Sequence, residues 1–332
     1  MQDILTCAMG LDIHRDVIVA CLAKGELGTD PEIEIRSFST LIPEMRKLRD
    51  WVLEAECRYV AMESTGIYWQ PIYEMLEPCF DGQISILVVN ARHMKNVPGR
   101  KTDMRDAQWI ATLLRAGLLK GSFIPDKTFR ELRHLTRYRK SIVRDITAQK
   151  NRIDKFLQSS GFRFTAFLSD AFGASGRNII RHLMEYGNIS REALDRCLKT
   201  QTRKRIDEIL IALNGSLSEH QRGFLRMIFG HLEALEQHRH TVEDAITKEI
   251  TKHEEALSLL CSIPGIDVTA AAAIIAEIGT DMSAFPDSQH ICSWAGLSPG
   301  NNESAGKRKS AHINKGNPYL KSMLCEVGWV IS

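Results

Sequence analysis

The order of apolar runs along the first part of the chain is the feature that most constrains its fold. Residues 4–22 hold two β-rich runs interrupted at residues 14–16, and residues 33–40 hold a third, which together predict an antiparallel meander. The apolar spacing then alternates between helical stretches, 41–57 and 67–76, and short strand-like runs, RYVAM and ISILVVN. With a further helix after these, the order β-β-β-α-β-α-β-α predicts a mixed α/β domain that ends near Leu119.

Four acidic residues occupy the ends of these elements. Asp12 follows the run CAMGL, and Glu63 follows VAM, so sequential folding in an RNase H-like sheet places both carboxylates at neighbouring strand ends. The small Gly10 allows a close approach there. Asp103 and Asp106, in KTDMRDA, open a predicted helix, and their spacing of three sets them on one side of it. That side continues as the predicted buried face, formed by Ala107, Ile110, Ala111 and Leu114.

Four converging carboxylates repel one another strongly unless cations neutralise them. Hard oxygen ligands in that number suit two Mg²⁺ ions about 3.5–4 Å apart, an arrangement that promotes phosphodiester cleavage. Taken singly, Asp12 is explained as a turn acid, Glu63 as a surface acid and Asp103 as a charge favoured at a helix N-terminus. Their occurrence as an ordered set on the expected elements favours the metal site.

Charge distribution predicts a polyanionic partner. Residues 92–163 hold 18 Lys or Arg against 6 Asp or Glu, although the whole chain of 332 residues carries a net charge of only +2. The eight cysteines form no CxxC pair, which predicts reduced thiols rather than a zinc site or a disulfide scaffold. No apolar run approaches the roughly 20 residues that a membrane span requires, so we expect a soluble, cytoplasmic protein without a membrane partner.

The second part of the chain is predicted to be mostly helical. Steps of three and four from Leu132 and from Leu225 each meet apolar residues at six of eight positions, which predicts two long helices that pair with each other or across a dimer. Residues 158–203, between them, are predicted to form short helices and loops. The segment LLCSIPGIDVTAAAAIIAEIG fits either a helix-hairpin-helix or an ordinary αα-hairpin. The last predicted helix is still amphipathic at Ser332, so we expect the natural chain to continue further.

At these residues the chain resembles the DEDD-type insertion-sequence transposases of the IS110 family. The similar motifs occur in the family's order: GLDIHRDVIVACL, AMESTGIYW, VVNARHMKNVPGRKTDMRDAQWIATLL, SIPGIDVTAAAAIIAEIG and WAGLSPGNNESAGKRKSAHINKGNPYLKSML. The resemblance implies a RuvC-like nuclease domain at 1–125, a helical coiled-coil connector at 126–256 and a mostly α C-terminal transposase domain at 257–332. It also implies that Asp12, Glu63, Asp103 and Asp106 are the catalytic metal ligands.

The resemblance further implies a serine nucleophile, which matches Ser304 in ESAGK. Its hydroxyl would attack a DNA phosphate and form a phosphoserine intermediate. Residue type alone predicts a turn residue at this position and does not separate Ser304 from Ser310. Ala305 stands where many relatives carry Gly. Family membership also implies a homo-oligomer (dimer or tetramer) that combines the acids of one subunit with the serine of another, and a structured noncoding RNA that guides DNA choice.

Basic residues flank both candidate sites and stud the first long helix. We expect phosphate contacts, which give salt-dependent affinity with little sequence information, from Arg92, Lys95, Arg100, Lys101, Arg133, Arg137, Lys140, Lys307, Arg308 and Lys315. The sequence therefore predicts a transposase that cuts and rejoins DNA, acting at the nucleoid. Two alternatives stay open: a RuvC-like junction nuclease that uses water, and an inactive DNA-binding remnant of a transposase. A sugar-kinase-like ATPase would need a second Asp-Gly phosphate loop, which the sequence lacks.

Overall fold

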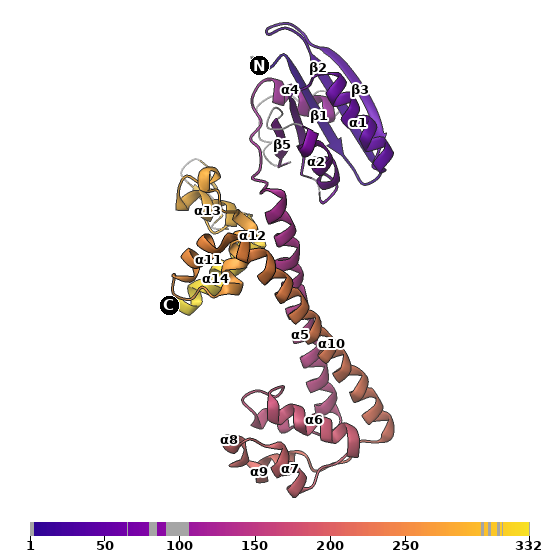
Figure 1. The fold of residues 1–332 in the computed structure, drawn as a ribbon, viewed down its shortest axis with the longest axis vertical. Helices are drawn as coiled ribbons and strands as arrows, with labels where there is room; N and C mark the ends of the chain where they lie inside the picture. Colours follow the sequence, from indigo (N-terminus) through magenta and orange to yellow (C-terminus); the bar gives the residue numbers. More distant parts are fainter. Residues whose placement is uncertain are drawn as a thin grey trace. The chain divides into compact units, whose positions relative to one another are not determined.

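The computed structural model describes residues 3–64, 66–79, 85–90, 106–299, 302–304, 307–310, 313 and 315–331. The chain divides into two compact units, Met1–Ile124 and Pro125–Ser332 (Figure 1). Within the described residues, none of the helices is both long enough and apolar enough to cross a membrane.

The first unit is built on a mixed sheet of five strands in the order β3-β2-β1-β4-β5. The antiparallel part confirms the predicted meander: β1 pairs with β2, and β2 with β3. Strands β4 and β5 extend the sheet on the other side of β1 in parallel. This arrangement fits the expected RNase H-like start. The bounds are β1 (Cys7–Ile13), β2 (Val17–Lys24), β3 (Glu32–Ser39), β4 (Tyr59–Glu63) and β5 (Ser85–Val89).

Helices cover both faces of this sheet (Figure 1). One face packs on α1 (Ile42–Glu54) and α2 (Gln70–Leu76), which is followed by the 3-10 turn η1 (Glu77–Cys79). The opposite face packs on α4 (Asp106–Arg115), which is amphipathic and buries the side that the sequence predicted. Alternation along β1 sorts its side chains between the two layers: Met9, Leu11 and Ile13 meet α1 and α2, while Ala8 faces α4.

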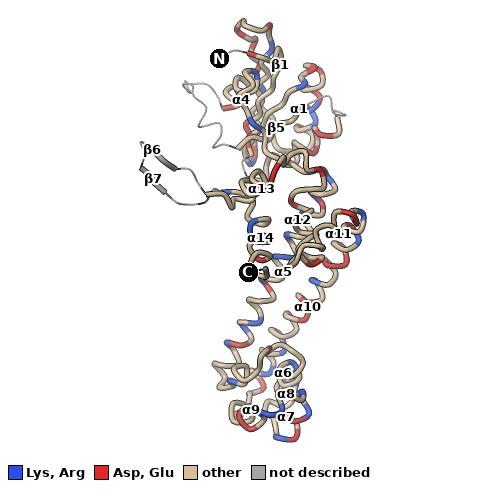
Figure 2. The backbone as a smooth tube through the Cα atoms, turned by 90° about the vertical axis from the view of Figure 1, so that its left-hand side faces the viewer, with Lys and Arg blue, Asp and Glu red and all other residues tan. Residues whose placement is uncertain are grey.

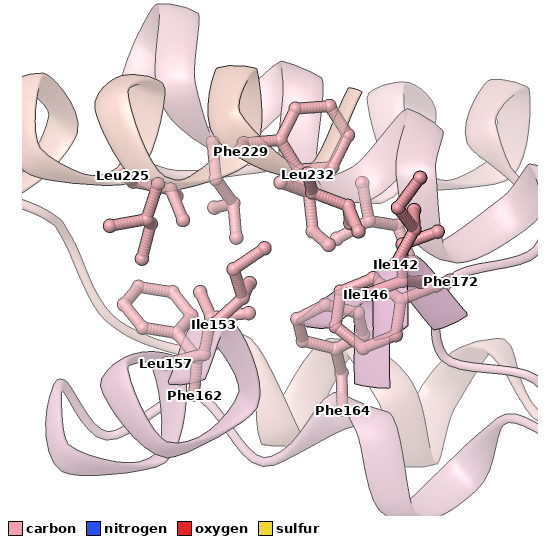
Figure 3. Packing of buried hydrophobic residues seen from close by; sticks show 14 of the residues in the cluster. Ile142, Ile146, Ile153, Leu157, Phe162, Phe164, Phe172, Leu225, Phe229 and Leu232 are labelled. Carbon is pink, nitrogen blue, oxygen red and sulfur yellow. The ribbon is translucent and has the colours of Figure 1, made fainter. Parts of the chain in front are cut away.

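The second unit is organised around two long helices, α5 (Lys127–Ser159) and α10 (Glu219–Ile250), which lie side by side (Figure 1). Two contacts show that the helices are antiparallel. Arg139 in the first half of α5 pairs with Glu243 near the end of α10, and Gln149, further along α5, donates a hydrogen bond to the Ile228 carbonyl oxygen in the first half of α10. The helices therefore pair within the chain, which is one of the two predicted arrangements. Figure 3 shows how residues of both predicted apolar seams, including Ile142, Ile146, Leu225 and Leu232, meet in one core.

Short helices fill the connection between α5 and α10, as predicted. This connection closes the far end of the same core with phenylalanines: Phe164 belongs to a short helix, and Phe162 and Phe172 lie in the loops beside the helices (Figure 3). Their bounds are η2 (Phe164–Phe167), α6 (Ala174–Tyr186), α7 (Arg191–Cys197), α8 (Thr200–Arg203) and α9 (Ile206–Ala212).

The last part of the second unit is a helical cluster that packs on α5. The helical hairpin predicted there forms: α11 ends, the chain turns at Gly265 (φ +82°), and Asp267 caps α12 by accepting a hydrogen bond from the Ala270 amide. Helix α12 is buried against α5 and α14. The bounds are η3 (Thr251–His253), α11 (Glu254–Cys261), α12 (Val268–Ile278), η4 (Met282–Ala284), α13 (Ser288–Ala295), β6 (Asn302–Ser304), β7 (Lys307–Ser310) and α14 (Pro318–Ile331).

Candidate functional site

Three of the four predicted acids lie at neighbouring element ends in the first unit. Asp12 is the penultimate residue of β1, Glu63 is the last residue of β4, and Asp106 is the first residue of α4. The parallel register pairs Leu11 with Met62, so one further step along both strands sets Asp12 beside Glu63. By the alternation of side chains, both acids point to the α4 face of the sheet.

Gly10 brings α4 against this part of the sheet. A Cβ atom on Gly10 would lie 2.3 Å from the Ala107 carbonyl oxygen and 2.4 Å from the Ala111 amide nitrogen, so only glycine allows the helix backbone to pack here. Ala107 directly follows Asp106, and Gly10 lies two residues before Asp12 on the same face of β1. The close approach therefore places the N-terminus of α4 next to Asp12.

The charges of Asp106 and Glu63 both act on the Asp12 carboxyl. The Asp12 side chain is 14% exposed. Burial raises the pKa of the Asp12 carboxyl above its usual range, and the charges of Asp106 and Glu63 raise it further. His14 opposes the shift, since its Nε2 lies 3.2 Å from Asp12 Oδ2. Apart from this histidine, the described surroundings disfavour the ionised carboxylate, so a bound cation would stabilise it.

The donor set fits a hard divalent cation, but the described acids are only part of the predicted ligand set. Among the described residues, no three His, Cys, Asp or Glu side chains are arranged so that they could hold a metal ion. Asp103, the fourth predicted acid, lies outside the described residues. Carboxylate oxygens are the ligands that Mg²⁺ prefers, and burial together with the charges of Asp106 and Glu63 raises the pKa of Asp12.

Ser304 lies in the second unit, at the end of a short antiparallel ladder. It is the last residue of β6, and its backbone pairs with Lys307 of β7, while Ser310 pairs with Asn302. A bridge between Pro299 and Ile313 continues the pairing toward the base of the ladder. The backbone therefore presents Ser304 next to the tip and Ser310 further from it.

The predicted basic residues have different surroundings. Arg92, Lys95, Arg100 and Lys101 lie outside the described residues; Lys307 and Arg308 belong to β7, and Lys315 is exposed. Lys140 lines a cleft of about 580 Å³ between α5, α10, α12 and α14, together with Arg139 and Arg144. Lys and Arg recur along this part of α5 (Figure 2).

Arg133 and Arg137 make contacts that the sequence analysis did not foresee. Both guanidinium groups bind the buried carboxylate of Glu277 in α12, at 3.0 and 2.7 Å. These two arginines therefore hold α5 to α12, and they share the single negative charge of Glu277. Glu277 is the one charged residue of the largely apolar helix VTAAAAIIAEI. A single charge on such a helix was the signal in the sequence that a cation must pair with it.

Comparison with known families agrees with this layout. Residues 9–161 match a family model described as a transposase, and residues 257–332 match one described as "Transposase IS116/IS110/IS902 family". The first match covers the β1–β4 acids and α5, and the second covers the α11–α14 cluster with Ser304. Both matched models describe transposase families.

Curated relatives point the same way. One is "Putative transposase y4qE" of Sinorhizobium fredii, 22% identical over 233 residues, which are 69% of this chain and 47% of the relative. Another is "Insertion element IS110 uncharacterized 43.6 kDa protein" of Streptomyces coelicolor, 28% identical over 245 residues, with 68% of this chain and 59% of the relative covered. The chain thus spans about half the length of these relatives. It belongs to the IS110 family of transposases.

Proposed function

We propose that this protein cuts and rejoins DNA strands to mobilise an insertion sequence, with a divalent-metal site at its four acids and a serine nucleophile at Ser304. The observation that carries the proposal is the environment of Asp12. Its carboxyl is largely buried, its pKa is raised by burial and by the charges of Asp106 and Glu63, and it follows Gly10, which α4 contacts closely. Repulsion among carboxylates at the carboxyl ends of β1 and β4 is what a metal site of a DNA-acting enzyme would relieve.

The acids divide the work of holding metal. Asp12, Glu63 and Asp106, joined by Asp103, would hold two Mg²⁺ ions, which when bound supply Lewis-acid stabilisation of phosphate oxygens. His14 donates a hydrogen bond to, or pairs its charge with, the Asp12 carboxylate and so orients it. Helix α4 contributes its N-terminus at Asp106, where the helix dipole favours negative charge.

Ser304 supplies the nucleophile in this proposal. Its oxygen bonds to phosphorus as the bond from phosphorus to a deoxyribose oxygen breaks, and the serine proton ends on that leaving oxygen. Attack by the hydroxyl of a second strand then releases the serine and joins the DNA. The preference for Ser304 over Ser310 rests on the family resemblance and is compatible with its place near the tip of the β6–β7 ladder.

Partners follow from the family and from charge. Lys140 and Arg144 in the cleft, Lys307 and Arg308 on β7, and the basic segment before α4 are proposed to contact DNA phosphates. A dimer or tetramer that combines the acids of one subunit with the serine of another, a structured guide RNA, and a cytoplasmic, nucleoid-associated location belong to the same proposal.

Matched serine variants test the mechanism. Ser304→Ala and Ser310→Ala are incubated with Mg²⁺ and duplexes that contain the ends of the element, and covalent protein–DNA adducts are counted on denaturing gels. We expect the adduct in the parent and in Ser310→Ala but not in Ser304→Ala. Undiminished strand cleavage by Ser304→Ala, with no adduct in the parent, would establish the junction nuclease that uses water. Absence of cleavage and joining in the parent would favour the inactive remnant.

A further inference from the structure

One buried carboxylate joins three separate elements of the second unit. The Glu277 side chain in α12 is 3% exposed and accepts hydrogen bonds from Arg137 Nε at 2.7 Å and from Asn317 Nδ2 at 2.6 Å. Arg133 Nε lies 3.0 Å from the same carboxylate and its Nη2 donates to the Glu277 carbonyl oxygen at 2.7 Å. Glu277 therefore ties helix α5 to Asn317, the residue directly before α14.

This network serves geometry better than stability. Desolvation lowers the pKa of Arg133 to about 10, so bringing this guanidinium into the interior has a cost. Buried ion pairs often do no better than well-packed apolar groups in overall stability, but each partner demands its partner in one position. Arg137 also stacks on the Tyr319 ring at 4.3 Å, which adds a second link from α5 to the start of α14.

Asn317 is the residue through which the network reaches the serine ladder, defined here as strands β6 and β7. Its side-chain oxygen accepts hydrogen bonds from the Tyr319 and Leu320 amides at 3.0 and 3.2 Å and so caps α14. The backbone N–H of Asn317 donates a hydrogen bond to the Trp294 carbonyl oxygen at 2.8 Å, near the end of α13. Asn317 thus fixes the exit of the segment that carries the ladder against its entry.

The entry and exit of this segment are in direct backbone contact. A Cβ atom on Gly316 would lie 2.2 Å from the Gly296 amide nitrogen and 2.4 Å from the Trp294 carbonyl oxygen. The first and last residues of the segment that carries the ladder therefore pack as closely as glycine permits. From there the Pro299–Ile313 bridge and the β6–β7 pairing continue the ladder to Ser304. Any shift of Asn317 is therefore transmitted to the base of the ladder.

We propose that Glu277 is a positioning residue for Ser304, which it holds in place through Asn317 and the base of the serine ladder; this inference rests on the proposed serine mechanism. The arginines of α5 make the long helix the fixed reference, and Asn317 passes its position to the ladder. Glu277 itself touches no substrate in this account.

Loss of the Glu277–Asn317 hydrogen bond tests the proposal in the full chain. Asn317→Asp keeps a side-chain cap for α14 but replaces the amide donor, which lies 2.6 Å from Glu277, with a second carboxylate, so the link becomes repulsive. Asn317→Ser keeps a hydroxyl cap for α14, but its side chain is too short to reach Glu277, so the link is removed without an added charge. Glu236→Gln breaks the Arg177 ion pair between α6 and α10, neither residue of which lines the cleft with Lys140, and serves as the matched control.

Two readouts are measured on each variant: hydrogen–deuterium exchange of the β6 and β7 amides, and the rate of Ser304–DNA adduct formation at saturating DNA. We expect Asn317→Asp to speed exchange about tenfold or more and to slow adduct formation by about 10–100-fold, the scale of a misplacement of about 1 Å. DNA affinity and exchange within α5 and α10 should stay at parental values. Asn317→Ser should change both readouts in the same direction by a smaller factor, and Glu236→Gln should leave both unchanged.

The outcomes separate this inference from the proposed function. Parental exchange and adduct rates in folded Asn317→Asp and Asn317→Ser proteins would overturn the positioning role while the serine mechanism stands. A parent that forms no Ser304 adduct would overturn the serine mechanism and, with it, the positioning role, even if exchange in the ladder responds to the Asn317 variants.

Discussion

Replacement of Gly10 by alanine tests how the fold positions the acids. The added Cβ would lie 2.3 Å from the Ala107 carbonyl oxygen, whereas ordinary contacts begin at 3.4 Å, so α4 must move away by about 1.1 Å. The opposing atoms belong to the helix backbone, so no side-chain rotation relieves the overlap. Because Asp106 precedes Ala107, the displacement moves one predicted metal ligand away from Asp12.

The expected magnitudes follow from this overlap. Overpacking of a tight interior costs about 1–3 kcal/mol, which lowers the melting temperature of the first unit by roughly 4–12 °C. A ligand displaced by about 1 Å should slow Mg²⁺-dependent strand cleavage by about 100-fold. Calorimetry of the full chain resolves the thermal transition, hydrogen exchange in α4 locates the disturbance, and a cleavage assay measures the rate.

Gly230→Ala in α10 is the matched control, because a Cβ there meets nothing within 4 Å. Helix propensity predicts that it stabilises the second unit by about 0.5–1 kcal/mol, without effect on cleavage. If Gly10→Ala kept the parental melting temperature and cleavage rate, the close packing of α4 on β1 would not be what positions the acids.

Four further predictions concern the site, its pH dependence, the fold and the DNA. Asp12→Asn should raise the melting temperature of the metal-free chain, because it removes a charge that burial and neighbouring carboxylates disfavour, and it should abolish the stabilisation of about 1.4 kcal/mol expected at Mg²⁺ tenfold above its dissociation constant. The raised pKa of Asp12 means that the folded site binds a proton more tightly than the unfolded chain does. Its ionisation penalty should therefore disappear as the pH falls through the raised pKa, while Mg²⁺ binding weakens over the same range; thermal titrations at several pH values check both, with Asp12→Asn lacking the dependence. Arg115→Met should destabilise the first unit by about 3 kcal/mol in denaturant unfolding, since the 1%-exposed Arg115 pairs with Asp3 at 3.1 Å and bonds backbone carbonyls. Lys140→Glu combined with Arg144→Glu should make the slope of log binding constant against log salt concentration shallower, by the equivalent of about one to two phosphate contacts. An unchanged slope would show that the cleft does not contact DNA.

The sheet and the place of its acids could be predicted because local patterns determine them. The predicted break at residues 14–16 is the turn between β1 and β2, and the alternation of apolar and small residues along β1 sorts Asp12 to the α4 face. Parallel pairing of β1 with β4 then brings Glu63 beside Asp12, because each acid follows the paired residues Leu11 and Met62. Gly10 was expected to allow close approach, and the helix backbone is what approaches.

The Glu277 network could not be predicted from spacing alone. Arg133 and Arg137 follow the periodicity of exposed cations on a long helix, and their partner is about 140 residues away in the chain. Hydrophobic patterns report which face is buried but not which buried charge meets which cation. The sequence also left the partner of each long helix open, because an apolar seam fits a second copy as well as it fits the same chain.

A Mn²⁺ titration followed by electron paramagnetic resonance tests the central claim, that the acids of the first unit form a divalent-metal site. The full chain is titrated with and without duplex DNA, and Asp12→Asn, Asp103→Asn and, in the second unit, Glu243→Gln are titrated in parallel. The account predicts two bound, magnetically coupled ions in the parent and in Glu243→Gln, and their loss in both aspartate variants. Unchanged binding in Asp12→Asn, or no binding to the parent under either condition, would contradict it.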